Sequence, residues 1–460
     1  MNALKIKLQE HRATAAVIGL GYVGLPLAME IAAAGFDVIG IDLDRNKVSA
    51  LQQGKSYILD VPEKLVADTV RLGKFTPTTD FNALAKADTV SICVPTPLSK
   101  SRDPDISFIL SATEEIRKHL HRGQLVVLES TTYPGTTDEL IVPELESSGL
   151  KVGSDFCVAF SPERIDPGNA NFTTHNTPKI VGGITAQCTE IARLFYSQFI
   201  ERVIPVSSTK CAEMVKLLEN TFRSVNIGMV NELALMCDLL GVDVYEVIDA
   251  AATKPFGFSP FYPGPGLGGH CIPIDPHYLA WKLKALNFQA RFIGLAAEIN
   301  GMMPSVVTSL VADGLNRVSK SIRGSKIMIL GVAYKKNVSD CRESPALDVM
   351  RLLQEKGAIL AYNDPLVPSL RLGRSTLESI ETSRANIAAH DCVIIVTDHS
   401  AYNFPEIVEA AQLVVDTRNA TKNLHAFNDR IIKLGAGNGA PSATHDREAN
   451  ETAALGLAAH

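Results

Sequence analysis

The stretch Ala15-Ala-Val-Ile-Gly-Leu-Gly-Tyr-Val-Gly24 decides the fold of the first part of this chain. A short apolar run enters a turn with the pattern G-x-G-x-x-G, and a helical pattern follows over 25–34. The first glycine permits a tight turn, the second lets the backbone approach a pyrophosphate, and the third lets helix and strand pack closely. The stretch therefore predicts a dinucleotide-binding unit, whose cofactor loop consists of Gly19, Gly21, Tyr22, Val23 and Gly24.

Asp42 closes the next predicted strand, 36–42, at about the 20-residue spacing expected of a ribose-binding acid. A carboxylate there accepts hydrogen bonds from the ribose diol and repels a 2′-phosphate, so NAD is predicted in preference to NADP. Arg45 and Lys47 lie nearby in the sequence and weaken that preference. The alternative is a glycine turn beside a surface aspartate, which the flanking strand and helix disfavour.

Strands and helices alternate through the first half of the chain, which predicts a parallel sheet with right-handed crossovers. Apolar positions at three- and four-residue steps then predict one long amphipathic helix over 209–241. A second strand–helix pattern begins at Lys326 without a glycine fingerprint. Further strands are expected at 89–94, 125–128, 156–160, 358–362, 392–396 and 413–416.

The predicted fold class is α/β, with two Rossmann-like doubly wound parallel-sheet domains joined by a long central helix. The expected parts are an N-terminal NAD-binding domain at 1–205, a central helical domain at 206–305, a second Rossmann-like domain at 306–435 and a disordered tail at 436–460. A chain of 460 residues is too long for a single core, which agrees with this division.

Composition and charge narrow the class of protein. The chain is 46% hydrophobic and 20% charged, as in an ordinary globular protein, and its net charge of −6 favours neither nucleic acid nor an anionic membrane. The start has no signal-peptide pattern, and no uninterrupted apolar run reaches the roughly 20 residues of a membrane helix. The 8 cysteines form no C-x-x-C pair. A cytoplasmic protein is therefore expected.

Two polar side chains on the long helix are candidate reacting groups. Lys216 and Asn220 are four residues apart and share a face, and Arg223 lies about one turn further along. A lysine beside an asparagine can stabilise a developing alkoxide. The lysine acts as a proton acceptor or a cation, and the asparagine acts as an oriented hydrogen-bond donor. A solvated helix face is the alternative.

Cys271 follows a glycine-rich run in Gly264-Pro-Gly-Leu-Gly-Gly-His-Cys-Ile-Pro-Ile-Asp-Pro276. A thiol is useful when an aldehyde must be oxidised again. It traps the aldehyde covalently, and the oxidised product can then leave the thiol as an acid. Asp275 would supply a carboxylate near it. A zinc site of His270, Cys271, Asp275 and His277 is a rival interpretation, but no second Cys or His cluster supports it.

Three loops after predicted strands carry further candidates. The loops 94–97 and 129–135 offer hydroxyl groups for a ribose or a reacting oxygen, although ordinary turn chemistry explains them as well. In the loop 161–168, Glu163 is a candidate base for hydrolysis and Arg164 is a candidate substrate clamp. A surface turn is the alternative there.

Together these elements resemble the UDP-sugar 6-dehydrogenase (UDP-glucose/GDP-mannose dehydrogenase) family over about residues 14–425. The motifs that carry the resemblance are Gly19-Leu-Gly-Tyr-Val-Gly24, Val94-Pro-Thr-Pro97, Ser161-Pro-Glu-Arg164, Met214-Val-Lys-Leu-Leu-Glu-Asn220, Gly268-Gly-His-Cys271, Tyr334-Lys-Lys336 and Asp340-Cys-Arg-Glu-Ser344. The resemblance implies an NAD domain, a dimer-forming helical middle and a UDP-binding domain. It also implies two hydride transfers from the sugar C6 to two NAD molecules.

The resemblance assigns roles to individual residues. Cys271 would attack the aldehyde to give a thiohemiacetal and then a thioester, Lys216 and Asn220 would hold the C6 oxygen, and Asp275 and Glu163 would assist proton transfer and water attack. Thr131 would lie near the reacting carbon and the cofactor. The implied NAD contacts are Asp42, Lys47, Thr96 and Arg342. The implied nucleotide-sugar contacts are Arg164, Ile165, Arg223, Lys254, Tyr334, Lys335 and Arg418.

One departure from the family pattern concerns Ile274, which stands where members that oxidise UDP-glucose or GDP-mannose usually carry a lysine. The run around it resembles the branch that oxidises UDP-N-acetylhexosamines for bacterial surface polysaccharides such as O-antigen and capsule. The stretch 253–267 looks closest to UDP-N-acetylglucosamine 6-dehydrogenases. UDP-glucose, UDP-N-acetylgalactosamine and UDP-N-acetylmannosamine remain alternative substrates.

Two rival functions stay open from the residues themselves. A single-step hydroxyacid dehydrogenase also combines a nucleotide domain, a helical domain and a Lys/Asn pair, but it makes no use of Cys271. A catalytically silent sensor of NAD or a nucleotide-sugar is the second rival, and the complete set of reacting groups argues against it. The number of NADH formed per substrate separates the first rival from a thiol route.

Overall fold

The structure is a computed structural model that describes residues 1–437, except 59, 100–102, 167, 168, 170, 270 and 428. The described chain divides into two compact units. Met1–Thr221 and Ile274–Ala290 form the N-terminal unit, and Phe222–Pro273 with the residues from Arg291 onward form the C-terminal unit. Most of the tail expected at 436–460 lies outside the described residues.

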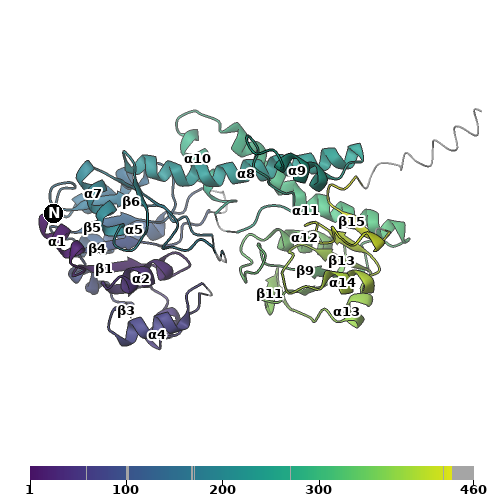
Figure 1. The fold of residues 1–460 in the computed structure, drawn as a ribbon, viewed down its shortest axis with the longest axis horizontal. Helices are drawn as coiled ribbons and strands as arrows, with labels where there is room; N and C mark the ends of the chain where they lie inside the picture. The colour runs from purple at the N-terminus through teal and green to yellow at the C-terminus, as the bar shows by residue number, and fades with distance from the viewer. Residues whose placement is uncertain are drawn as a thin grey trace, which may run out of the picture. The chain divides into compact units, whose positions relative to one another are not determined.

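The N-terminal unit is built on a sheet with the strand order β3-β2-β1-β4-β5-β6-β7-β8 (Figure 1). The first six positions have the order of a doubly wound dinucleotide-binding sheet, in which ligands bind where the strand order reverses. β7 pairs antiparallel with β6, and every other neighbouring pair in this sheet is parallel. The strands are β1 (Thr14–Ile18), β2 (Asp37–Ile41), β3 (Phe75–Thr78), β4 (Thr89–Ile92), β5 (Leu125–Leu128), β6 (Cys157–Phe160), β7 (Lys179–Gly183) and β8 (Val203–Pro205).

Helices cover both faces of this sheet, which explains why its strands are continuous apolar runs. Ala15 and Val17 of β1 belong to one buried cluster, whereas Ala16 and Ile18 belong to another. The helices of the unit are α1 (Asn2–Gln9), α2 (Gly24–Ala33), α3 (Arg45–Gln52), α4 (Glu63–Arg71), η1 (Phe81–Lys86), α5 (Ser107–His119), η2 (Thr137–Ile141), α6 (Val142–Glu146), α7 (Ala186–Tyr196) and α10 (Asp275–Lys284).

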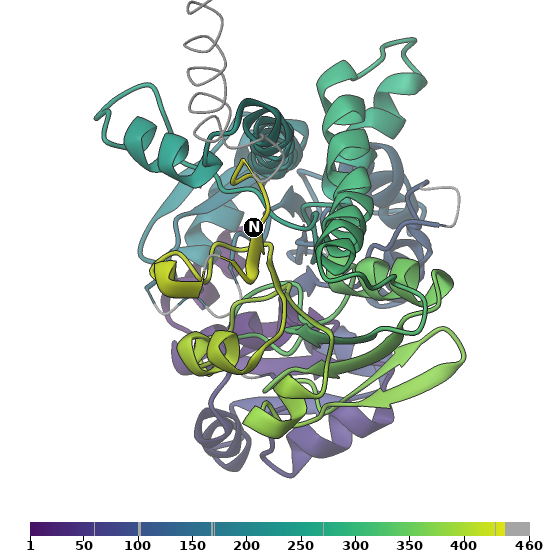
Figure 2. The same cartoon turned by 90° about the vertical axis from the view of Figure 1, so that its right-hand side faces the viewer.

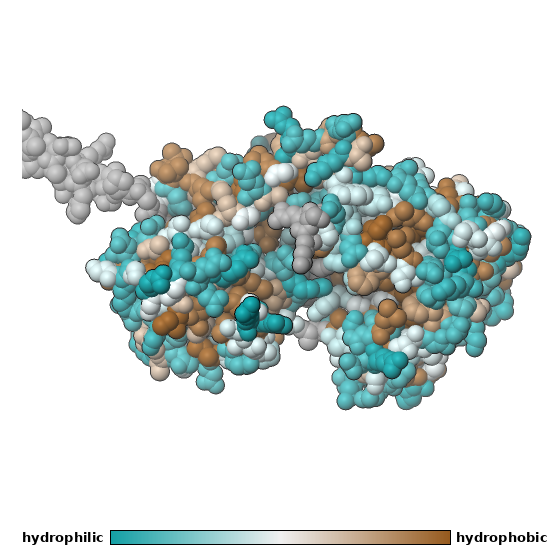
Figure 3. All heavy atoms as spheres, turned by 180° about the vertical axis from the view of Figure 1, so that it is seen from behind, coloured by the Kyte–Doolittle hydropathy of each residue, from teal (hydrophilic) through white to brown (hydrophobic). Residues whose placement is uncertain are grey.

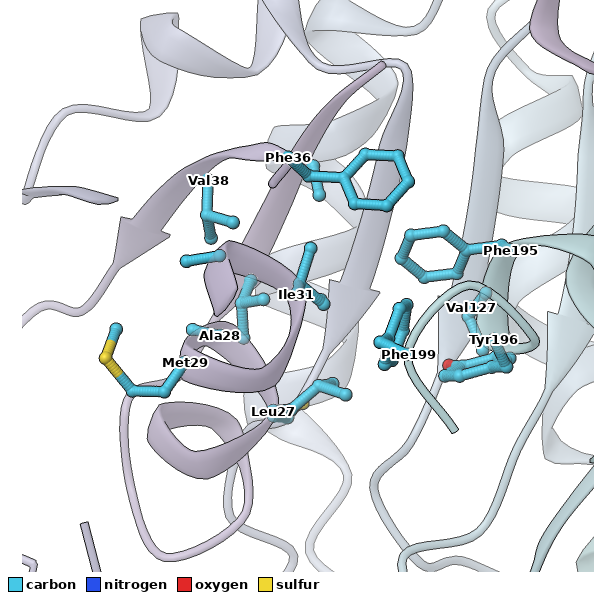
Figure 4. Close-up of a cluster of buried hydrophobic side chains, with 14 of the residues drawn as sticks. Leu27, Ala28, Met29, Ile31, Phe36, Val38, Val127, Phe195, Tyr196 and Phe199 are labelled. Atoms are coloured by element: carbon cyan, nitrogen blue, oxygen red, sulfur yellow. The ribbon is translucent and has the colours of Figure 1, made fainter. Parts of the chain in front are cut away.

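Aromatic residues of α7 seal one of these two clusters (Figure 4). Phe195 packs edge-on against Phe36 at a centroid distance of 6.4 Å and against Phe199 at 5.1 Å. Tyr196 is fully buried in the same cluster, so its hydroxyl needs a partner inside the protein. That partner is the buried carboxylate of Glu129, directly after β5.

The long central helix α8 (Thr209–Leu240) begins at the predicted residue and ends one residue early. Its buried side carries apolar residues such as Leu217 and Val230, and also the polar Glu213, Lys216 and Asn220. Much of the expected apolar face is instead exposed: Leu218 (60%), Phe222 (50%), Met229 (52%), Met236 (48%) and Leu240 (74%). The periodicity therefore predicted the helix correctly, but it did not identify the face that packs within one chain.

The C-terminal unit contains a parallel sheet in the order β10-β9-β13-β14-β15 and a small antiparallel hairpin, β11–β12. Figure 2 shows this hairpin, in light green, extending away from the larger sheet. The strands are β9 (Lys326–Leu330), β10 (Ile359–Asn363), β11 (Ser369–Leu372), β12 (Ser375–Glu378), β13 (Cys392–Ile395), β14 (Val414–Asp416) and β15 (Ile431–Lys433). The helices are α9 (Val244–Ala252), α11 (Arg291–Arg317), α12 (Pro345–Glu355), α13 (Arg384–Ala388), α14 (Phe404–Ala410) and η3 (His425–Phe427).

Helix α11 is long and apolar enough to meet the length and hydropathy criteria of a membrane span, which core helices also meet. It packs against α12 and β14, and Val307, Val311 and Leu315 are fully buried in the core of the C-terminal unit. These contacts identify it as a core helix of this unit. The face in Figure 3 carries several hydrophobic patches among hydrophilic residues.

Candidate active site

The glycine turn between β1 and α2 has the geometry that its sequence requires. Gly19 has a φ of +90°, and a Cβ there would lie 2.5 Å from the carbonyl oxygen of Cys93. A Cβ on Gly24 would lie 1.8 Å from the carbonyl oxygen of Gly19. By contrast, a Cβ on Gly21 would meet nothing within 4 Å. The first and third glycines therefore serve packing, while the second leaves open space for a ligand, as a pyrophosphate site needs.

Asp42 directly follows β2 and points its carboxylate at this turn. Its Oδ2 accepts a hydrogen bond from Leu20 N at 2.9 Å, and its Oδ1 accepts one from Asp44 N at 2.9 Å. The ammonium of Lys47 lies 3.4 Å from Oδ2. The structure thus brings the glycine turn, Asp42 and Lys47 together, which fits the ribose and pyrophosphate of a bound dinucleotide. Tyr57 was not predicted, yet its hydroxyl donates to Leu20 O at 2.6 Å.

The two hydroxyl-rich loops lie beside one another at the ends of β4 and β5. Ser130 Oγ donates to Val94 O at 2.7 Å, and the hydroxyl of Tyr278 donates to Thr96 O. Thr96 is buried and Thr131 is half-buried. Because neighbouring parallel strands end at the same edge of the sheet, both loops lie at the edge where a doubly wound sheet binds its cofactor.

A buried carboxylate on α8 fixes the second of these loops. Glu213 is 1% exposed and accepts hydrogen bonds from Gly135 N at 2.6 Å, Thr137 N at 3.0 Å and Thr137 Oγ1 at 2.7 Å. Lys216 follows one turn later on the same helix. Glu213 was not predicted, although a glutamate three residues before Lys216 on the same helix face was a usable signal.

Lys216, Asn220 and Asp275 lie in one buried group, with exposures of 8%, 5% and 3%. Asn220 Nδ2 donates to Asp275 Oδ2 at 2.5 Å, which joins α8 to the first residue of α10. Burial raises the pKa of Asp275 to about 6, and the charge of Lys216 and the bond from Asn220 limit the rise. A solvated helix face is therefore wrong for Lys216 and Asn220.

An apolar cluster next to this group explains the desolvation of Asp275. The cluster contains Ile274 and Leu217, which are sequence neighbours of Asp275 and Lys216. It also contains Tyr278, which lies about one helical turn after Asp275. Tyr133 completes its buried part, and Trp281 packs against Tyr133 at a centroid distance of 5.0 Å. Ile274 is thus part of a packed apolar wall beside the polar group.

The loop after β6 is partly buried, so the surface-turn alternative is wrong for Glu163. Glu163 Oε1 accepts hydrogen bonds from Arg164 N at 2.7 Å and Ile165 N at 2.8 Å. Arg164 binds Glu219 of α8 through two nitrogens, at 2.6 and 3.3 Å, and donates to Pro178 O at 2.6 Å. The guanidinium predicted as a substrate clamp is therefore already fixed by a carboxylate of α8.

In the C-terminal unit, the glycine run before Cys271 packs tightly on two residues that were predicted to contact the substrate. A Cβ on Gly264 would lie 2.6 Å from Arg418 Nη1, and one on Gly268 would lie 2.7 Å from Tyr334 Cβ. Gly269 N donates to Arg342 O at 3.1 Å. Cys271 itself is exposed. The structure thus places the segment that leads to the thiol against Tyr334, Arg342 and Arg418.

A buried asparagine pair anchors the same run to the helices of the C-terminal unit. Asn231 of α8 accepts a hydrogen bond from Gly264 N at 2.9 Å and donates to Asn300 Oδ1 at 2.8 Å. Asn300 of α11 in turn donates to Ser224 O at 3.1 Å. Neither asparagine was predicted, because neither has a charged residue four positions away on its helix, as Asn220 has in Lys216.

The remaining predicted contacts also belong to the C-terminal unit. Arg223 and Lys254 are exposed, and Lys254 lies over the ring of Phe256 at 4.9 Å. Lys335 is half-buried, and Arg342 pairs with Asp340 at 2.7 Å. The predicted NAD contacts are therefore divided, because Arg342 belongs to a different unit from Asp42, Lys47 and Thr96.

Among the described residues, no His, Cys, Asp and Glu side chains gather in a group suited to a metal. His270 of the rival zinc site lies outside them.

Comparison with known proteins identifies the family. The NAD-binding, central and UDP-binding domains of the UDP-glucose/GDP-mannose dehydrogenase family match residues 13–200, 210–302 and 328–423. The chain belongs to this family and is an NAD-dependent UDP-sugar dehydrogenase, an oxidoreductase that acts on a CH–OH group. The resemblance predicted from the sequence is confirmed, as are the α/β fold class and the cofactor NAD.

Individual relatives differ in the sugar that they are named for. A UDP-N-acetyl-D-glucosamine 6-dehydrogenase from Pseudomonas aeruginosa is 33% identical over 389 residues, which are 84% of this chain and 90% of the relative. An NDP-N-acetyl-D-galactosaminuronic acid dehydrogenase from Ralstonia nicotianae is 34% identical over 418 residues, 88% of this chain and 95% of the relative. The solved UDP-D-ManNAc dehydrogenase of Pyrococcus horikoshii has a TM-score of 0.84 and 34% identity, and the match covers 92% of this chain and 99% of that one.

The glycine turn yields a first prediction, because two of its glycines differ in surroundings. Gly24→Ala forces a Cβ against the Gly19 carbonyl and is expected to lower the free energy of unfolding by about 1–3 kcal/mol. Gly21→Ala meets no protein atom, so we expect unchanged stability and NAD binding at least about tenfold weaker. Thermal unfolding and NAD titration measure both effects. Equal NAD affinity in Gly21→Ala and the wild type would contradict this assignment.

Asp275 yields a second prediction, which concerns stability against pH. Its pKa is about 6 in the folded protein, compared with about 3.9 in an unfolded chain. At a pH between these two values, Asp275 holds its proton in the folded protein but loses it in the unfolded chain. Its contribution to the free energy of unfolding therefore falls as the pH rises. The free energy of unfolding of Asp275→Asn, minus that of the wild type, should therefore increase by on the order of 2–3 kcal/mol from pH 4 to pH 7. Urea unfolding at several pH values tests this, and a pH-independent difference would contradict it.

Proposed function

We propose that this enzyme oxidises the C6 hydroxyl of UDP-N-acetylglucosamine to the carboxylate of UDP-N-acetylglucosaminuronic acid, for the synthesis of surface polysaccharides such as O-antigen or capsule. The observation that carries the proposal is the buried group of Lys216, Asn220 and Asp275, in a chain whose family motif also supplies the thiol of Cys271. The choice of N-acetylglucosamine rests on the sequence of 253–267, since the relatives are named for several N-acetylhexosamines.

The first oxidation is assigned to the buried group. NAD, held by the glycine turn, Asp42 and Lys47, would supply the hydride acceptor for the sugar carbon. The ammonium of Lys216 and the amide of Asn220, which donates to Asp275, hold the C6 oxygen, and the proton of the C6 hydroxyl passes to the Asp275 carboxylate. The loop with Thr131 is held by Glu213, which fixes it relative to the helix that carries Lys216. These residues all belong to the N-terminal unit.

The second oxidation is assigned to a covalent route. The S–H of Cys271 adds across the aldehyde C=O to give a thiohemiacetal. The thiohemiacetal becomes a thioester when its hydride passes to a second NAD and its hydroxyl proton to Asp275, which has released the first proton. Water then hydrolyses the thioester, with Glu163 as proton acceptor. The remaining substrate contacts in this proposal are Arg164, Ile165, Arg223, Lys254, Tyr334, Lys335 and Arg418, and the further NAD contacts are Thr96 and Arg342.

The number of NADH formed per sugar tests this route, and four sugars test the substrate. With limiting UDP-N-acetylglucosamine we expect two NADH per sugar and a higher kcat/KM than with UDP-glucose, UDP-N-acetylgalactosamine or UDP-N-acetylmannosamine. Cys271→Ser should form about one NADH and stop at the aldehyde level. One NADH per sugar in the wild type would favour a single-step dehydrogenase and reject the thiol route. A better rate with another sugar would reject only the choice of substrate.

We also propose that the chain acts in the cytoplasm as a homodimer, with parts at 1–205, 206–305 and 306–435 for NAD, dimerisation and catalysis, and UDP-sugar. The exposed apolar stripe of α8 supports the dimer, since contiguous apolar surface of this kind is typical of an interface. The double variant Met229→Glu/Met236→Glu should yield monomers in light scattering, whereas Phe172→Glu, at an equally exposed position outside the stripe, should not. A monomeric wild type would contradict the proposal.

A further inference from the structure

A buried ionic network extends from Glu163 into the core of the N-terminal unit. Lys179 Nζ lies 3.3 Å from Glu163 Oε2 and 2.6 Å from Glu129 Oε2. The hydroxyl of Tyr196 donates to the other oxygen of Glu129. The side chains of Lys179 and Glu129 are 5% and 0% exposed. A charge pair buried to this degree is costly unless every group is paired, so the network needs an explanation.

The antiparallel pairing of β7 with β6 brings Lys179 to Glu163. Phe160 pairs with Gly182 and Ala159 with Gly183. Continuing this register past the end of β6 places Glu163 opposite Lys179, the first residue of β7. Glu129 directly follows β5, the parallel neighbour of β6. All three charged groups therefore meet at the edge of the sheet where β5 and β6 end.

The network determines which acceptor positions of Glu163 are in use. A carboxylate has about four acceptor positions on its two oxygens. Among the described residues, Arg164 N and Ile165 N occupy two of them and Lys179 occupies a third. Burial opposes the charge on Lys179, but Glu129 and Glu163 outweigh it and raise the pKa of the ammonium, which stays protonated. Within the described part of the chain, three donors thus hold the carboxylate and one acceptor position is left.

We propose that Lys179 is a positioning residue for Glu163 and fixes its carboxylate to accept a proton from the hydrolytic water. This inference rests on the proposed thioester route. In that step the water oxygen bonds to the acyl carbon, and one water proton passes to Glu163. The C–S bond breaks with its electron pair on the sulfur of Cys271, and Glu163 then returns the proton to the thiolate. No oxidation occurs in the step, so Lys179 affects hydrolysis and neither hydride transfer.

The test separates hydride transfer from hydrolysis in rapid-mixing kinetics with UDP-N-acetylglucosamine and NAD. Lys179→Met should keep a burst of two NADH per subunit at close to the wild-type rate, followed by a steady state about 10- to 100-fold slower. Intact-protein mass spectrometry should show the acyl adduct on Cys271 during that phase. Glu129→Gln/Lys179→Met removes both buried charges together and should show the same pattern if Lys179→Met alone does not fold.

Lys118→Met is the matched control, because Lys118 is an exposed lysine of α5 that pairs with Glu115. It should behave as the wild type. If the burst rate and the steady-state rate fall by the same factor in the Lys179 variants, the positioning role is overturned. An unchanged rate of hydrolysis would overturn it as well. A wild type that does not give two NADH per sugar would overturn the proposed function and this inference with it. If the wild type forms two NADH per sugar and the Lys179 variants hydrolyse the thioester at the wild-type rate, only this inference is overturned.

Discussion

The hydrogen bond from Asn220 Nδ2 to Asp275 Oδ2 is the interaction on which the rest of the candidate site depends. The chain leaves the N-terminal unit after Thr221 and returns to it at Ile274. Asn220 and Asp275 therefore lie at the two ends of this excursion, and their bond joins them inside the unit. Because both groups are buried, each would carry a desolvation penalty without the other. The bond thus fixes the start of α10 on α8 next to Lys216.

Two carboxylates of the N-terminal unit have opposite surroundings, which suits them to different tasks. Asp275 lies beside an apolar cluster, burial raises its pKa to about 6, and the amide of Asn220 donates a hydrogen bond to it. Glu163 is surrounded by two backbone amides and the ammonium of Lys179. Different environments for paired titratable groups are a recurring way to separate acid and base roles. Here they separate the group next to Lys216 from the group assigned to water.

Most of the fold was predictable from local sequence signals. β5 was predicted to the residue, and the glycine turn, Asp42 and the start of α8 lie where their patterns predict them. These signals depend on nearest neighbours in the chain, such as strand periodicity and turn chemistry. The direction of β7 has no such signal, because strand pairing depends on contacts between distant residues. The network of Glu129, Lys179 and Glu163 was therefore missed, although Glu129 directly follows β5 and Glu163 lies three residues after β6.

The burial of α8 shows a second limit of sequence patterns. A periodic apolar stripe predicts a helix, but it does not say whether the stripe faces the chain's own core or another surface. Here the polar face of Glu213, Lys216 and Asn220 is the buried one, because each of these side chains lies among buried partners or charges inside the unit. An apolar stripe opposite a buried polar face is thus the combined signature of this helix.

A double-mutant cycle on Asn220 and Asp275 tests the central interaction most directly. The free energies of unfolding of Asn220→Ala, Asp275→Ala and the double variant are compared with that of the wild type at pH 7. A buried bond to a charged group predicts a coupling energy of about 1–3 kcal/mol. Effects that add to within about 0.5 kcal/mol would show that the two side chains do not interact, and would contradict the site described above.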